Sequence, residues 1–168
     1  MLTSHLFDLS GKIAVVTGAS SGLGQGAATL LAAQGAQVVA IARREDTLKA
    51  WSTVAKGETS VLAADLSSRS TLADIAVEAA RPFGTPDILI NAAGINTRQP
   101  ADDMTDAHWD LTQNLNVAAP FFLAKALVPA MRAKGWGRII NFASLQSRRA
   151  FANGISYGAS KGAVEQMT

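Results

Sequence analysis

Cysteine is absent from the 168-residue sequence, which excludes disulfides, thiolate catalysis and cysteine-ligated zinc. An excess of either charge is also missing, because 15 lysines and arginines face 13 aspartates and glutamates, for a net charge of +2. The basic residues are scattered, so no nucleic-acid-binding stripe is expected. No apolar run approaches the roughly 18 residues of a membrane span. The N-terminal segment lacks the apolar region of a secretory signal, so we expect a cytoplasmic protein with no membrane partner.

Candidate metal ligands are scarce as well. The two histidines, His5 and His108, stand apart from any spaced set of ligands, so no metal site is predicted. What the sequence does have is apolar character, since 48% of its residues are hydrophobic and only 17% are charged, and this composition disfavours disorder. The length suits one domain, and no linker or repeat interrupts the chain. We therefore predict a single domain over residues 1–168.

Short apolar runs alternate with helical patterns along the chain. The runs predict strands at residues 13–16, 37–42, 60–64, 87–93 and 137–144. The helical patterns cover residues 22–34, 45–55, 68–82, 106–134 and the stretch from residue 157 onward. Each connection is long enough for a crossover, so the strands are expected to form a doubly wound parallel α/β sheet with helices on both faces.

The expected helices carry local signals. The apolar stripe of the 22–34 helix consists of Leu23, Ala27, Leu30 and Leu31. Thr105 is a candidate N-cap for the helix that follows it. Pro120 lies inside the 106–134 stretch and is expected to kink it or to separate two helices.

The first strand leads directly into a glycine-rich turn, Thr17–Gly24. Gly18 permits a sharp exit from the strand, while Gly22 and Gly24 allow a ligand and the sheet to approach the backbone closely. Free N–H groups and the dipole at the start of the following helix favour a pyrophosphate. The G-x-x-x-G-x-G spacing differs from the common G-x-G-x-x-G fingerprint, so a ligand-free strand–helix turn is the alternative.

The choice between dinucleotides is expected at the end of the second strand. A carboxylate there would bind a ribose 2′-hydroxyl and select NAD. Instead, the strand ends in Arg43 and Arg44, and Arg43 suits bidentate binding of a 2′-phosphate. The sequence therefore favours NADP(H), with NAD as the alternative cofactor and a solvated surface arginine as the alternative role.

Four motifs follow one another along the chain: the Thr17–Gly24 turn, Asn91–Gly94 after the fourth predicted strand, Ser144 after the fifth, and Tyr157 with Lys161. In kind, order and spacing they resemble the short-chain dehydrogenase/reductase family. The resemblance covers nearly the whole chain and departs at Ala92, where many members have a second asparagine. It implies a Rossmann-type sheet and an enzyme that transfers a hydride between a nicotinamide cofactor and a secondary alcohol or ketone.

The loops after the fourth and fifth strands are similar to those of sugar-acid oxidoreductases of the gluconate 5-dehydrogenase and 2-deoxygluconate 3-dehydrogenase type. This likeness implies a small-molecule substrate such as gluconate. Arg148 and Arg149 either hold its carboxylate or remain surface charges. Two other functions stay open: a 3-oxoacyl reductase of the same family, and a catalytically silent dinucleotide-binding module.

Hydride transfer needs a proton donor or acceptor at the substrate oxygen. Tyr157 and Lys161 lie four residues apart, so on a helix they share a face and the ammonium would stabilise a phenolate. The resemblance implies that Lys161 also holds the nicotinamide ribose and that Ser144 hydrogen-bonds the substrate oxygen. It further implies that Asn116 holds a water that relays protons to Lys161. Asn114, two residues earlier, is the rival for that role.

The turn and the resemblance together place the cofactor against residues on several loops. They are Gly18, Ser20, Ser21, Gly22, Leu23, Gly24, Arg43, Asp65, Leu66, Asn91, Ala92 and Gly94, together with Tyr157 and Lys161. For Asp65 a helix N-cap is the alternative role, and for Asn91 and Gly94 a structural turn is the alternative.

Family members run about half as long again as this chain. The sheet is therefore expected to be incomplete at its C-terminal end, and the chain to be truncated after the tyrosine motif. An open edge and uncovered helix faces would make it poorly active and prone to association. The resemblance also implies a homodimer or homotetramer in the full-length form.

Overall fold

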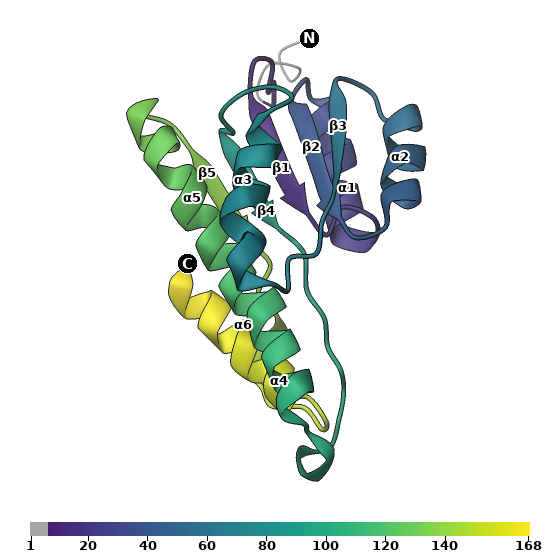
Figure 1. Ribbon diagram of the computed structural model, residues 1–168, viewed down its shortest axis with the longest axis vertical. Helices are drawn as coiled ribbons and strands as arrows, with labels where there is room; N and C mark the ends of the chain where they lie inside the picture. Colours follow the sequence, from purple (N-terminus) through teal and green to yellow (C-terminus); the bar gives the residue numbers. More distant parts are fainter. Residues whose placement is uncertain (1–6) are drawn as a thin grey trace.

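The computed structural model describes residues 7–168, so His5 lies outside the described residues. Five parallel strands form one sheet in the order β3-β2-β1-β4-β5 (Figure 1). The strands are β1 Ile13–Thr17, β2 Gln37–Ala42, β3 Thr59–Ala63, β4 Ile88–Asn91 and β5 Arg138–Asn141. β1 pairs with both β2 and β4, so the strand order reverses beside β1. The predicted doubly wound α/β fold is confirmed.

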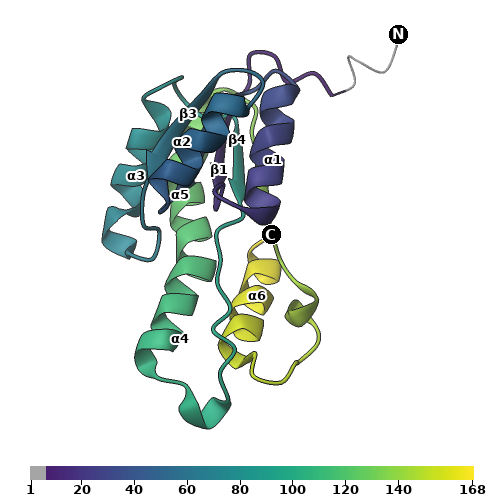
Figure 2. The ribbon, with the colours of Figure 1, turned by 90° about the vertical axis from the view of Figure 1, so that its right-hand side faces the viewer.

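Helices cover both faces of this sheet. They are α1 Gly22–Ala33, α2 Glu45–Val54, α3 Leu72–Ala80, α4 Asp106–Gln113, α5 Ala119–Ala133 and α6 Ile155–Met167. α1 and α2 pack on one face, and α3 and α5 on the other. α4 and α6 extend past the carboxyl ends of the strands, where the long loops after β4 and β5 also lie (Figures 1 and 2).

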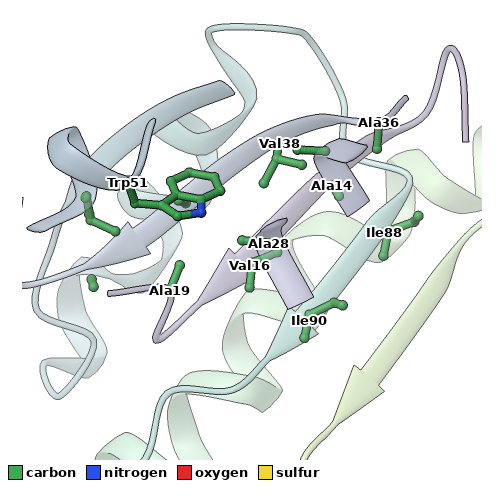
Figure 3. Close-up of a cluster of buried hydrophobic side chains, with 13 residues drawn as sticks. Ala14, Val16, Ala19, Ala28, Ala36, Val38, Trp51, Ile88 and Ile90 are labelled. Carbon is green, nitrogen blue, oxygen red and sulfur yellow. The ribbon is translucent and has the colours of Figure 1, made fainter. Parts of the chain in front are cut away.

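Each face of the sheet has its own hydrophobic core. Alternate residues of a strand point to opposite faces, so Val16 of β1 packs with Ala28 of α1 and Trp51 of α2 (Figure 3). Val15, its neighbour in sequence, packs with Leu123 of α5 on the other side. β1, β2 and β4 are thus buried on both faces, which is typical of the central strands of a parallel sheet.

The apolar stripe predicted for α1 faces the sheet only in part, because Ala27 and Leu31 pack against the core while its two other residues do not. Leu23 and Leu30 of the apolar stripe are 69% and 62% exposed, whereas Gly24, Ala28 and Ala32 face the sheet. The reason is steric, because small side chains let the helix axis lie close to the strands.

The 106–134 stretch is not divided into separate helices at Pro120. α4 continues through a π-helical segment, η3 (Asn114–Ala118), into α5, and Pro120 stands in the first turn of α5. Proline cannot donate a backbone hydrogen bond, and the wider π turn directly before it accommodates that loss. Thr105 caps α4 as predicted, accepting from the His108 N–H at 3.3 Å.

By length and composition, the 28 residues Asp106–Ala133 could cross a membrane. In the structure, however, Leu123, Leu127 and Met131 of this stretch are buried in the core that also contains residues of α3. It therefore packs as the core helix of an α/β sheet.

Several predicted element ends shift by one to three residues. β4 and β5 end at Asn91 and Asn141, earlier than the apolar runs indicated, because the chain then leaves the sheet for the site loops. α6 begins at Ile155, two residues before Tyr157. β5 is half exposed along its length, as expected for the outer strand.

A buried carboxylate ties the start of β4 to its neighbours. Asp87 is 5% exposed and accepts hydrogen bonds from the Ile13 N–H at 2.9 Å and from the Lys134 ammonium at 3.0 Å. Burial alone would raise the pKa of Asp87, but these two donors outweigh it and hold the pKa below its ordinary value.

We expect Asp87→Ala to lower the free energy of unfolding by about 3 kcal/mol, because it leaves a buried N–H and an ammonium without their acceptor. In the wild type this contribution is complete above the unfolded-state pKa of about 3.9 and is lost as pH falls through the lower folded-state value. Urea unfolding from pH 7 downward measures both effects. Asp102→Ala, at an exposed position, is the control, and equal stability of the two variants would contradict the prediction.

Candidate active site

The glycine-rich turn passes close against the loop after β4. Gly18 has φ +67°, and a Cβ there would lie 2.7 Å from the Ala93 nitrogen. A Cβ on Gly24 would collide with the carbonyl of Gly18, which explains why glycine stands at this position in the first turn of α1. The Thr17 hydroxyl accepts from the N–H groups of Ala92 and Ala93, each at 3.1 Å, and so fastens the β4 loop to the end of β1.

A cavity of about 350 Å³ opens over this turn. Most of the predicted cofactor-binding residues line it: Gly18, Ser20, Ser21, Leu23, Gly24, Arg43, Asp65, Leu66, Ala92 and Gly94. Gly22 is the start of α1 at φ +55°, with open space where a Cβ would be. The carboxyl ends of β1, β2, β3 and β4 therefore contribute to one concave surface beside the point where the strand order reverses.

Asn91 differs from the other predicted cofactor contacts. It is 4% exposed, and its side-chain amide donates to Asn141 Oδ1 on β5 at 2.9 Å. It does not line the cavity. The side chain therefore joins two strands, and its role as a cofactor contact stays a prediction.

Arg44 is a residue that the sequence argument did not assign to the site. Its guanidinium donates to the hydroxyls of Ser20 and Ser21, both at 2.9 Å, and to the Ser20 carbonyl at 3.2 Å. Arg43 also lines the cavity. The adjacent position of the two arginines was the available signal, but which of them faces the turn depends on how the backbone leaves β2.

Asp65 lies at the cavity rim directly after β3. Its carboxylate accepts a hydrogen bond from the Ser67 N–H at 2.9 Å. This bond closes a side-chain-to-backbone turn over residues 65–67 and does not cap a helix. The backbone hydrogen bond from Ser67 holds the pKa of Asp65 below its ordinary value. The side chain therefore stays an anion and an acceptor at neutral pH.

A second cavity, of about 230 Å³, adjoins the first. Leu23, Ala92, Gly94 and Ile95 line both cavities. The second one adds Asn96, Phe142, Ala143, Tyr157 and Lys161. One cleft thus runs from the glycine-rich turn to the tyrosine and lysine of α6.

Lys161 is 7% exposed and donates to the Phe142 carbonyl at 2.5 Å. Burial lowers the pKa of its ammonium, and its nitrogen lies 5.6 Å from the centre of the Tyr157 ring. The Tyr157 hydroxyl has no hydrogen-bond partner among residues 7–168, and the side chain lines the cleft. The structure therefore brings together the predicted pair, with the phenol open to a ligand.

Asn116, and not its rival Asn114, lies at this site. Its side-chain oxygen accepts the Ile95 N–H, and its amide donates to the Ile95 carbonyl and to the Ser160 hydroxyl, each at 2.9 Å. Ser160 in turn donates to the Tyr157 carbonyl at 2.7 Å. Asn116 thus connects the β4 loop to the backbone of the tyrosine helix, while its role as a water ligand stays a prediction.

Ser144 is less closely joined to the pair. Ala143 lines the cleft, whereas the Ser144 hydroxyl accepts the Gln146 N–H at 3.2 Å at the start of a short helix, η4 (Leu145–Ser147). The hydroxyl hydrogen has no acceptor among the described residues and is free for donation. Its role toward a substrate oxygen stays a prediction.

Comparison with known proteins identifies the family to which this chain belongs. Residues 12–168 match the family described as short chain dehydrogenase. An NAD-dependent glycerol dehydrogenase of Listeria innocua is 34% identical over 96% of this chain and 64% of its own length, and gluconate 5-dehydrogenase of Gluconobacter oxydans is 37% identical over 97% and 65%. A solved metagenomic short-chain oxidoreductase in complex with NADP has a TM-score of 0.89 at 39% identity, over 95% of this chain and 74% of that one.

The chain belongs to the short-chain dehydrogenase family. It spans slightly less than two thirds of the length of these two curated relatives.

Proposed function

We propose that the protein is an NADP(H)-dependent oxidoreductase that interconverts a secondary alcohol and a ketone, with a sugar acid such as gluconate as the substrate class. The observation that carries this proposal is the continuous cleft, with the glycine-rich turn and two arginines at one end and Tyr157 with Lys161 at the other. A dinucleotide is long enough to fill both ends of this cleft, whereas a ligand bound by the phosphate-binding turn alone would fill only one.

The residues present fit a dinucleotide phosphate. Ser21 makes no side-chain cap on α1, and the first turn of α1 contains no acidic residue. The positive end of the helix dipole therefore meets no competing negative charge from its own helix, which favours an anion there. Arg43 and Arg44 add two permanent positive charges at the same end of the cleft, where a 2′-phosphate would be bound.

The bound nicotinamide would supply or accept the hydride. Tyr157 would give its proton to the substrate oxygen during reduction and take it back during oxidation. The ammonium of Lys161, on the same face of α6, would stabilise the phenolate formed. Ser144 would donate its free hydroxyl hydrogen to the same substrate oxygen, and Asn116 would keep the β4 loop and α6 in register.

A cavity of about 460 Å³ beside η4 and α6 supports a polar, anionic substrate. Arg148 and Arg149 both line it. Arg148 is engaged in an ion pair with Glu165, so Arg149 is the better candidate for the substrate carboxylate. The relative named gluconate 5-dehydrogenase supports the same substrate class.

The test is a fluorescence titration with NADPH and NADH, followed by a turnover screen with keto-sugar acids and 3-oxoacyl thioesters. Reduction of keto-sugar acids supports the proposal, and a preference for the thioesters supports the 3-oxoacyl reductase alternative. Cofactor binding without any turnover by a full-length version points to the silent module. We further propose that the protein is cytoplasmic and forms a homo-oligomer. Phe121 and Ile140 expose apolar surface along α5 and β5, which favours association. Light scattering tests the oligomeric state.

Cofactor selection gives a separate prediction. Arg44→Ala is expected to weaken NADPH binding roughly 10- to 100-fold, because one charge-assisted hydrogen-bond donor to the 2′-phosphate is lost. NADH lacks that phosphate, so its affinity should fall less, only by what the lost hydrogen bonds from Arg44 to Ser20 and Ser21 contribute to the shared turn. Arg81→Ala is the matched control, since Arg81 is paired with Glu78 on α3 and is absent from the cleft lining. Equal losses for both cofactors would refute a role of Arg44 in selection.

A further inference from the structure

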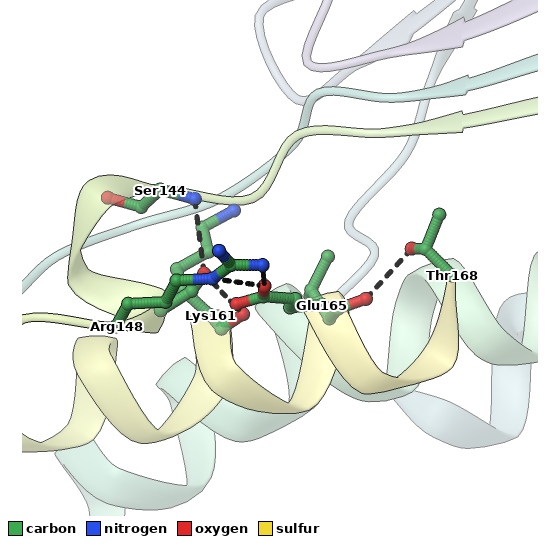
Figure 4. Close-up of polar contacts among 7 residues, drawn as sticks. Ser144, Arg148, Lys161, Glu165 and Thr168 are labelled. Atoms are coloured by element: carbon green, nitrogen blue, oxygen red, sulfur yellow. Dashed lines mark hydrogen bonds and ion pairs between the residues drawn. The ribbon is translucent and has the colours of Figure 1, made fainter.

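A single hydroxyl connects the backbones of two proposed site residues. Ser147 Oγ accepts the N–H of Ser144 at 3.3 Å and donates to the carbonyl of Lys161 at 2.8 Å (Figure 4). Ser147 ends η4, and Lys161 lies in the middle of α6, 14 residues further along the chain. The loop after β5 is therefore hydrogen-bonded to the tyrosine helix at the level of the lysine.

The same short helix sets the direction of the Ser144 side chain. The backbone of Ser144 is extended, with φ −158° and ψ 162°, and its hydroxyl accepts the N–H of Gln146. A backbone shift at Ser144 would move this hydroxyl with it. The hydrogen bond from the Ser144 N–H to Ser147 is thus one of the restraints on where the hydroxyl points.

Two further side-chain links join this loop to α6: Lys161 donates to the Phe142 carbonyl at 2.5 Å, and a weaker link involves Arg148. Arg148 pairs with Glu165, but its side chain is 82% exposed, and exposed ion pairs contribute little and are screened by salt. Ser147 is half-buried, and both of its hydrogen bonds are made to backbone groups. Its hydroxyl is therefore a more rigid connection than the Arg148 pair.

We propose that Ser147 is a positioning residue, which acts through Ser144 by fixing the Ser144 loop to α6 beside Tyr157 and Lys161. This inference rests on the proposed function. Ser147 also lines the cavity of about 460 Å³ assigned to the substrate, but the role proposed here depends only on its hydrogen bonds to Ser144 and Lys161. The hydroxyl works as a spacer between two backbones, so its chemistry is replaceable only by another short side chain that both donates and accepts.

The activity test compares five variants of the full chain. Ser147→Ala is expected to lower kcat roughly 10- to 100-fold, the cost of a small misplacement of a reacting group, while the KM for NADPH stays unchanged. Ser147→Thr keeps the hydroxyl and should restore most of the rate. Ser52→Ala is the control, because it removes a half-buried serine hydrogen bond, to Thr59 at 2.6 Å, away from the cleft lining. The double variant Ser144→Ala/Ser147→Ala should be no slower than Ser144→Ala alone.

A second readout needs neither cofactor nor turnover. Backbone hydrogen exchange, followed by NMR on the free protein, should show faster exchange of the Ser144 N–H in Ser147→Ala and unchanged exchange in Ser52→Ala. A full-length wild type without turnover would refute the proposed function, and the exchange experiment would still decide the link. Unchanged Ser144 exchange, an unchanged kcat in Ser147→Ala, or a double variant in which the two losses multiply would overturn the positioning role.

Discussion

Tyr157→Phe is expected to lower kcat about 1,000-fold while leaving the dissociation constant for NADPH within a factor of about two, because general acid–base catalysis contributes roughly 10²- to 10⁴-fold. The substitution removes the hydroxyl, which has no hydrogen-bond partner among the described residues, and keeps the ring that lines the cleft. Folding and cofactor binding should therefore survive. The measurement is NADPH oxidation under saturating keto-sugar acid, alongside a fluorescence titration with NADPH.

The ionisation of Tyr157 can be followed directly by absorbance, because Tyr157 is the only tyrosine in the sequence. The near-ultraviolet absorbance of phenolate in the wild type therefore follows one residue. If Tyr157 is the acid and base, the pH profile of kcat/KM should coincide with that titration in the free protein, which Tyr157→Phe abolishes. Wild-type rates in Tyr157→Phe would remove the tyrosine from the mechanism, and a matching loss of NADPH affinity would make its role structural.

The parts of the site that could be predicted from sequence are those encoded by local backbone requirements. Gly18 needs a positive φ, and Gly24 tolerates no Cβ, so the turn is visible as spaced glycines. Tyr157 and Lys161 lie one helical turn apart, so they share a face whether the helix begins at Ile155 or at Tyr157. The two-residue error in the start of α6 therefore had no effect on the predicted pair.

What could not be predicted depends on packing between distant segments. The sequence shows two adjacent arginines, but only the tertiary structure turns Arg44 onto Ser20 and Ser21. Asn91 follows an apolar strand in the same way as a loop residue would, and only the pairing of β4 with β5 directs it to Asn141. Such contacts join residues 23 to 50 positions apart, beyond the reach of periodicity or capping rules.

The choice between Asn114 and Asn116 shows the same limit. Both lie in η3, and a regular α-helix would place them on different faces. The π-helical turn changes the rotation per residue, so helical spacing alone is an unsafe guide there. The side chain of Asn116 contacts both Ile95 and Ser160, and its role as a water ligand stays a prediction.

Lys161→Met is expected to lower kcat by roughly 10²- to 10³-fold without unfolding the protein, because the phenolate loses its stabilising cation. Methionine fills a similar apolar length in the buried site. The substitution removes the donor to the Phe142 carbonyl, but it also removes the cost of burying an ammonium. We therefore expect the free energy of unfolding at pH 7 to stay within about 1 kcal/mol of the wild type. Urea unfolding and steady-state kinetics measure the two effects.

The pH dependence of stability distinguishes this lysine from an ordinary surface one. Burial lowers the folded-state pKa of Lys161 below the unfolded value of 10.5, so between these two values the unfolded chain binds more protons. The free energy of unfolding of the wild type should therefore gain a contribution that rises with pH through that window, and Lys161→Met should lose this rise. Lys49→Met, at an exposed residue paired with Glu45, is the control. If the variants at 161 and 49 have the same pH dependence, the ammonium of Lys161 is hydrated in solution and cannot act from a buried position beside Tyr157.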